Sequence, residues 1–172
     1  MPFTPFHFGP AALVKALFRY RFSFGLFCLV QIFIDGETLY HILRNEHPVH
    51  GTLHTFLGSN IAVAAGLLFR PLYVKALNLL IAFDKGMKTK FTLSISSALF
   101  TLVLAAYSHV FFDSLMHGDI RPFYPFSDAN PFLGIISVDL LHAVCLLSAG
   151  AGVIILGLRY APRKRKRRGD PS

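Results

Sequence analysis

The chain has 172 residues, of which 53% are hydrophobic and 15% are charged, and its formal net charge is +8. This composition excludes an ordinary soluble domain, in which roughly a quarter of the residues are charged, and favours one integral membrane domain. The two cysteines, Cys28 and Cys145, both lie in apolar segments. Their placement argues against a disulfide framework and against a cysteine-based zinc site.

Four apolar segments are long enough to cross a bilayer as helices, which takes about 20 residues each. We expect these spans at residues 22–43, 55–83, 91–115 and 134–160. The second span contains Arg70-Pro71, where proline can kink or break a helix. A helix over residues 10–20 is too short to cross alone. The sequence therefore predicts an all-α integral membrane bundle of about four transmembrane helices plus a short N-terminal helix.

A block of lysines and arginines at residues 163–168 directly follows the last apolar segment. Such a block can mark a nucleic-acid patch or a nuclear signal. Its position after a span favours an anchor that contacts anionic lipid headgroups, so we expect membrane lipids and no nucleic acid as partners. Residues 1–160 are predicted to form one transmembrane domain, and residues 161–172 a disordered cytoplasmic tail. The N-terminus lacks the basic region and cleavage site of a signal peptide, and we expect it to remain on the mature protein.

The basic residues also predict the orientation of the spans. In a four-span topology most of them fall on one side: Lys15, Arg19, Arg21, Lys75, Lys85, Lys88, Lys90 and the block at 163–168. The positive-inside rule places that side, and both termini, in the cytoplasm. Most histidines and carboxylates then fall on the opposite side. Because the topology rests on lysine and arginine alone, this second clustering is an independent observation.

His7 precedes the first span and would lie apart from the other histidines in a simple four-span bundle. A helical hairpin removes this conflict. If residues 10–20 and 22–35 run antiparallel about a turn at Tyr20-Arg21, His7 and Asp35 are each about 14 residues, or roughly 20 Å, from the turn. The hairpin would then be re-entrant and buried against other helices.

His109 and Asp113 lie four residues apart at the end of the third span, so a helix would place them on one face. His50 and His54 form a second pair of this kind if their segment is helical. Ionisable side chains are costly inside a membrane, which makes them candidate functional residues. Imidazoles mixed with carboxylates suit zinc, and also manganese or iron. The pattern predicts a site for one or two divalent ions, with Asp35 as a further oxygen ligand.

Several short motifs, in this order along the chain, resemble the YdjM-like family of bacterial inner-membrane proteins, described as membrane-bound, metal-dependent hydrolases. The matching elements are a histidine near the N-terminus (His7), an acidic Ile34-Asp35-Gly36-Glu37, the histidines of residues 50–54, a Ser-His-x-x-x-Asp element at residues 108–113 and the aromatic segment at 123–126. The resemblance covers roughly residues 1–130. This chain departs from the family pattern in three respects. No proline precedes Asp35, Glu37 replaces an aspartate, and His50 and His54 are four residues apart instead of five, with no arginine after His50.

The residues and the resemblance together lead to one functional hypothesis. The chain would hydrolyse a small-molecule, lipid or phosphoester substrate with metal-activated water, on the non-cytoplasmic side of a bacterial inner membrane. The expected metal ligands are His7, Asp35, His54, His109 and Asp113, and the expected catalytic residues are Glu37, as general base, and His50. A haem-binding electron carrier and a non-enzymatic scaffold, ion-binding or transport-associated factor are the alternatives. No role is assigned to His41, His117 or Asp119.

Overall fold

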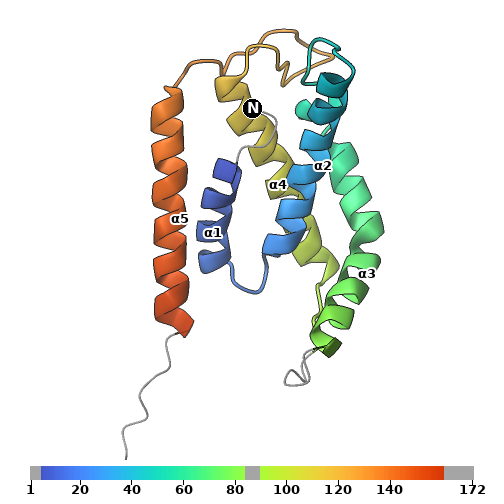
Figure 1. Ribbon diagram of the computed structural model, residues 1–172, viewed down its shortest axis with the longest axis vertical. Coiled ribbons are helices and arrows are strands. Elements are labelled where there is room, and N and C mark those ends of the chain that lie inside the picture. The colour runs from blue at the N-terminus through green and yellow to red at the C-terminus, as the bar shows by residue number, and fades with distance from the viewer. Residues whose placement is uncertain (1–4, 84–89, 161–172) are drawn as a thin grey trace, which may run out of the picture.

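The computed structural model describes residues 5–83 and 90–160. These residues form five α-helices and no strand: α1 (Phe8–Leu17), α2 (Phe24–Leu43), α3 (Asn60–Phe83), α4 (Ile95–Met116) and α5 (Val138–Tyr160) (Figure 1). Two short 3-10 helices, η1 (Pro5–His7) and η2 (Thr52–His54), precede α1 and α3. All the α-helices except α1 are long and apolar enough to cross a membrane. The predicted all-α membrane bundle is confirmed.

The central helix is α4, which packs against both α2 and α3. Its inner face carries small residues, among them Ala98, Ala105 and Ala106, which are fully buried. Small side chains let membrane helices approach closely, because lipid provides no hydrophobic force to hold them together. The outer faces of α3 and α5 expose leucine and isoleucine side chains instead, such as Leu68, Leu147 and Ile154. Small residues inside and large apolar residues on the outer surface are typical of a helix bundle surrounded by lipid.

The second span does not break at Arg70-Pro71. Helix α3 is continuous from Asn60 to Phe83, with Pro71 inside it. Membrane helices tolerate proline where neighbouring groups compensate for the lost backbone hydrogen bond. Beside Pro71, and apart from the bond that the proline removes, the Arg70 guanidinium donates to the carbonyl of Leu93, with a distance of 2.8 Å from Nε. This bond ties the middle of α3 to the segment that leads into α4.

Helix α1 runs antiparallel to α2, as the hairpin hypothesis predicts, but it packs chiefly on α5 (Figure 1). The two helices lie side by side along their length. Arg159 donates a hydrogen bond of 2.5 Å to the carbonyl of Ala16, and the rings of Phe6 and His142 stack with centroids 4.0 Å apart. Gly152 permits the close approach, because a Cβ at this position would lie 2.6 Å from the carbonyl carbon of Ala12.

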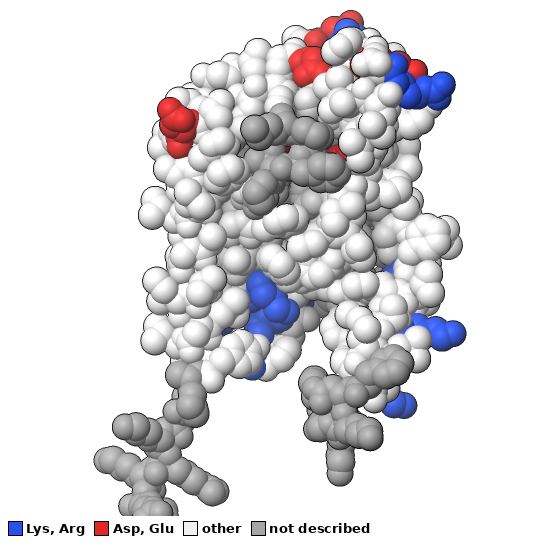
Figure 2. Space-filling model, viewed as in Figure 1, with Lys and Arg blue, Asp and Glu red and all other residues white. Residues whose placement is uncertain are grey.

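The hairpin places η1 beside the first turns of α5, toward the end of the bundle opposite Tyr160 (Figure 1). Both termini are expected on the cytoplasmic side, but the described chain begins at η1 and stops at Tyr160, at opposite ends of the bundle (Figure 1). Residues 1–4 and 161–172, and with them the expected disorder of the basic tail, lie outside the described residues. The charges separate along the long axis of the bundle. Figure 2 shows Lys and Arg in the lower half of this face, and Asp and Glu in the upper half together with some basic side chains.

The contact between α1 and α5 gives a testable consequence. Replacing Gly152 by leucine is expected to push α1 away from α5, because the added side chain meets the backbone of α1. Overpacking of this kind costs about 1–3 kcal/mol. Thermal unfolding in detergent should show a lower Tm for Gly152→Leu. Gly150→Leu in the same helix is the matched control, since a Cβ there meets nothing within 4 Å, and equal Tm values for the two variants would contradict this packing.

Candidate metal centre

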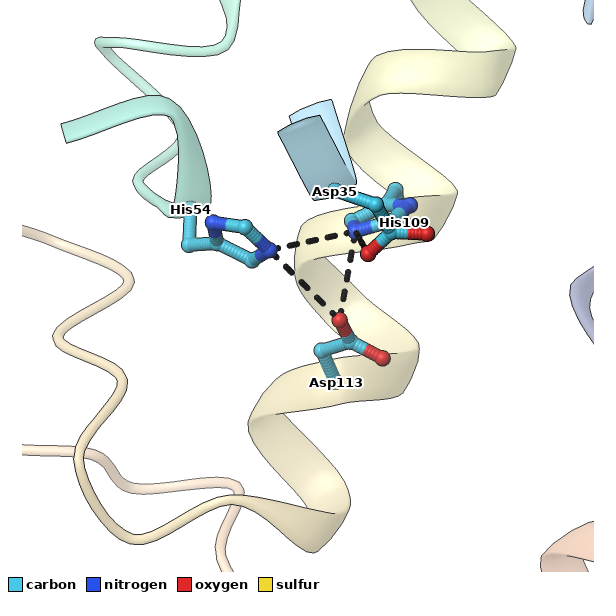
Figure 3. A group of neighbouring side chains, drawn as sticks. All are labelled: Asp35, His54, His109 and Asp113. Atoms are coloured by element: carbon cyan, nitrogen blue, oxygen red, sulfur yellow. Dashed lines mark hydrogen bonds and ion pairs between the residues drawn. The ribbon is translucent and has the colours of Figure 1, made fainter. Parts of the chain in front are cut away.

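Four polar side chains from three elements converge between the helices (Figure 3). Asp35 comes from α2, His54 from η2, and His109 and Asp113 from successive turns of α4. One ligand atom from each side chain lies within 4.8 Å of the other three, and all of these residues except Asp35 are fully buried. The sequence separations are large, so the packing of α2, η2 and α4 is what assembles the group.

The distances between the ligand atoms match the coordination shell of a metal ion. The Nε2 atoms of His54 and His109 are 3.3 Å apart. Asp113 Oδ2 lies 3.2 Å from His109 Nε2 and 3.7 Å from His54 Nε2. Asp35 Oδ1 lies 3.4 Å from His109 Nε2. Around a tetrahedral zinc ion with bonds of about 2.0–2.1 Å, neighbouring ligand atoms are roughly 3.4 Å apart.

The second nitrogen of each of these imidazoles faces an oxygen acceptor. His54 Nδ1 lies 3.4 Å from Glu37 Oε2, and His109 Nδ1 donates to Gln31 Oε1. The orientation of the Gln31 amide is fixed, because its Nε2 donates to the carbonyl of Ala105 at 3.1 Å. An imidazole that carries its proton on Nδ1 has a lone pair on Nε2. This is the tautomer that oxygen acceptors impose on the histidine ligands of metals.

With their protons on Nδ1, His54 and His109 direct the lone pairs of Nε2 at each other inside the bundle, and the Thr38 hydroxyl lies 3.4 Å from His54 Nε2. Such an approach is unfavourable in a buried site unless a cation lies between the nitrogens. The carboxylate of Asp113 is also buried, and it directs Oδ2 at both Nε2 atoms. These buried histidines and aspartates could hold a divalent metal ion, which would lie among the two Nε2 atoms, Asp113 Oδ2 and Asp35 Oδ1.

His7 reaches this group through the hairpin. Its Nε2 atom lies 3.0 Å from Asp113 Oδ1, and its ring centroid lies 4.8 Å from that of His109. Its own Nδ1 is buried without a hydrogen bond to the described residues. The structure thus brings together the five residues that the sequence predicts as metal ligands: His7, Asp35, His54, His109 and Asp113. Their role as ligands stays a prediction.

The α-helical pair expected for His50 and His54 does not form. The helical turn η2 covers only Thr52–His54, and Gly51 before it has non-helical backbone angles, with φ −95° and ψ −146°. Even so, the two rings lie 4.8 Å apart, because the loop folds back over the end of α4. His50 belongs to a second group that could hold a metal ion, together with Asp113 and His117.

Glu37, the predicted general base, lies behind His54. Its Oε2 atom accepts a hydrogen bond of 2.8 Å from the backbone nitrogen of Leu53, besides its contact with His54 Nδ1. The carboxylate therefore attaches η2 to α2 and orients the His54 ring. This position suits a positioning residue, and catalysis by Glu37 stays a prediction.

His50 and Asp119 form a pair in the loops outside the spans, with His50 Nδ1 2.8 Å from Asp119 Oδ1. Burial lowers the pKa of His50, and the nearby His54 acts in the same direction against the influence of Asp119. Burial alone would raise the pKa of Asp119, but the hydrogen bond and charge of His50 outweigh it and lower this pKa. At neutral pH His50 is therefore neutral, with a nitrogen free to bind a ligand, and Asp119 is charged.

The sequence reasoning left His117 and Asp119 without a role. The sequence did contain a signal, because His109, Asp113 and His117 recur every four residues, the spacing that places side chains on one face of a helix. His117 lies just beyond the apolar segment, and a histidine at that position is typical of an ordinary residue at the membrane interface. Asp119 could not be found from spacing, since its partner His50 lies in a different loop.

Comparison with known proteins identified no relative. No protein-family model matches the chain, and no curated protein or solved structure is significantly similar to it. The resemblance to the YdjM-like family accordingly stays a prediction based on the motifs.

The Gln31 amide offers a test of the metal centre at a residue that is not itself a ligand. Gln31→Leu removes the acceptor for His109 Nδ1 while preserving approximate size. Loss of such an outer partner typically weakens metal binding about 10–100-fold. Competition with a chelator in detergent would measure the change. Gln31→Glu, which keeps an oxygen acceptor, is the matched control and should bind more tightly than Gln31→Leu; equal affinities for both variants and the wild type would contradict the proposed role.

Proposed function

We propose that this chain is an integral membrane, metal-dependent hydrolase. It holds a divalent ion, zinc or else manganese or iron, with Asp35, His54, His109 and Asp113. The observation that carries the proposal is the approach of the His54 and His109 Nε2 atoms to 3.3 Å. Both imidazoles have an oxygen acceptor at Nδ1, so a cation between the two Nε2 atoms accounts for their geometry.

The surroundings of the four ligands suit hydrolysis. An ion in such a site lowers the pKa of water toward about 7 and polarises a carbonyl or phosphoryl oxygen. Asp35 is the most accessible ligand, with 14% of its side chain exposed, against 5% for Asp113 and 1% for His109. Asp35 therefore marks the least enclosed side of the ligand group. Glu37, with 17% of its side chain exposed, stays the candidate general base for the attacking water.

The same geometry argues against the haem alternative. A haem iron held by two histidines has the porphyrin plane between their rings. Here the carboxylate of Asp113 lies within 3.7 Å of both imidazoles. The carboxylate occupies space that a porphyrin would need, and it is a hard oxygen ligand better suited to zinc or manganese.

The location of the centre supports an amphiphilic substrate. The ligands lie on α2, α4 and the loop before α3, toward the end of the bundle where carboxylates gather (Figure 2). By the positive-inside rule this end faces away from the cytoplasm, and the bacterial inner membrane is the membrane that the motif resemblance implies. A centre at the edge of the hydrocarbon layer can reach the ester or phosphoester bonds of a lipid.

Metal content tests the first half of the proposal. The wild-type protein, purified in detergent, is expected to carry stoichiometric zinc, manganese or iron by elemental analysis. His109→Ala should lose this metal, because it removes a nitrogen that contacts three of the other ligand atoms. His47→Ala, at an exposed histidine away from the group, is the control and should retain it. A wild-type protein that binds none of these metals would remove the proposal.

Hydrolysis tests the second half. Mixed micelles containing bis(p-nitrophenyl) phosphate, p-nitrophenyl acyl esters or short-chain phosphatidylglycerol would serve as substrates. We expect metal-dependent turnover of at least one, lost after chelation and reduced by at least about 100-fold in Asp113→Asn, since the charge of this carboxylate would hold the ion. Metal binding without turnover of any of these substrates would instead favour the non-catalytic alternative, an ion-binding membrane factor.

A further inference from the structure

We propose that the centre holds a second metal ion, bound by His50, His117 and Asp113, and that the two ions share the carboxylate of Asp113. The ligand atoms of this second group lie within 4.8 Å of one another. The inference rests on the proposed function and deepens it, because a pair of ions about 3.5–4 Å apart typically serves phosphoester or amide hydrolysis.

Helix α4 provides the frame for sharing one carboxylate. His109, Asp113 and His117 lie on one face, with Asp113 in the middle. The backbone nitrogen of His117 still donates to the carbonyl of Asp113 at 2.9 Å, so the helical spacing extends to this residue. Asn130 then fixes the end of the helix by donating a hydrogen bond of 3.1 Å to the carbonyl of His117. The His117 ring lies 4.5 Å from the ring of His50.

His50 is held in the same way as the histidines of the first group. Asp119 accepts from its Nδ1 at 2.8 Å through Oδ1, and from its backbone nitrogen at 3.3 Å through Oδ2. A carboxylate behind an imidazole fixes the tautomer and leaves Nε2 free as a ligand. Asp119 would thus orient the His50 ring through its Nδ1 atom, as Glu37 orients His54 and Gln31 orients His109. An oxygen acceptor behind a third histidine supports a second metal site.

The carboxylate of Asp113 is suited to serve two ions. One oxygen, Oδ2, lies among the ligand atoms of the first group. The other, Oδ1, is buried and has His7 Nε2 3.0 Å away. Asp113 belongs to both groups of potential ligands, and a carboxylate has two oxygens that can each accept. With one cation on each side, this one carboxylate would offset charge in both groups.

The second group also borders an opening. A cavity of about 160 Å³ is lined by His50 and Asp119, and its wall includes Arg121 and Tyr124, but none of the four ligands of the first group. Of the three ligands proposed for the second ion, only His50 lines it, so a molecule that enters here would reach His50 before any other ligand. The guanidinium of Arg121 suits an anionic oxygen, although in this structure it pairs with Asp128 at 2.8 Å. This opening, together with two ions, favours a phosphoester over an uncharged ester as the substrate.

Metal stoichiometry tests the second site. Protein in detergent would be stripped with chelator, reloaded with Mn²⁺ and freed of excess metal. We expect two ions per chain in the wild type and in His47→Ala, and one in both His117→Ala and His50→Ala, which remove different ligands of the same site. One ion per chain in the wild type, still lost in His109→Ala, would overturn the second site and leave the proposed function standing. No ion in the wild type would overturn both.

Electron paramagnetic resonance of the Mn²⁺ protein tests the shared carboxylate. Two manganese ions bridged by Asp113 should give an exchange-coupled spectrum. His117→Ala, with one ion, should give the hyperfine-split spectrum of an isolated ion. Two ions per chain with uncoupled spectra would overturn the bridge. An unchanged Tm of the metal-free variants, relative to the metal-free wild type, would establish that lost ions reflect lost ligands; if His117→Ala unfolds, His50→Ala in the loop provides the same comparison.

Discussion

A buried carboxylate must be offset by positive charge or by donors, and at Asp113 the proposed metal ion together with His7 would meet this requirement. Imidazoles surround this carboxylate from three parts of the chain: His7 before α1, His54 in η2 and His109 one turn earlier on α4. None of these contacts would form if α1, η2 and α4 did not meet at one level of the bundle. The position of this single charge therefore constrains the path of the whole N-terminal half.

The bonds that hold the histidines also determine how the helices pack. Apolar membrane helices can slide past one another at little cost, since lipid and leucine side chains are equally apolar. Polar contacts remove this freedom between α2 and α4: Gln31 bonds both Ala105 and His109, and at the other end the Ser23 nitrogen donates to Thr101 Oγ1 at 3.1 Å. The register of the two helices is thus set by the residues that orient the candidate ligands.

Hydropathy and length were sufficient to predict the spans, because a bilayer imposes a minimum length on any apolar helix. They could not locate the start of α3. The apolar pattern begins near Thr55, but a turn in which the Gly58 nitrogen donates to Thr55 Oγ1 delays the helix to Asn60. The candidate site was predictable where ligands share a helix, as His109 and Asp113 do. Partners such as Asp119 and His50 come together only through the folding of two loops, and no spacing in the sequence predicts such a contact.

The pairing of α1 with α5 links the two extremes of the sequence. Synthesis proceeds from the N-terminus, so α1 enters the membrane long before its main partner exists. Until α5 is inserted, Gly152 and Arg159 are not available to hold α1 in place, and His142 is not available to stack on Phe6 beside His7. Insertion of α5 is therefore also the step that fixes His7 next to the candidate ligand Asp113.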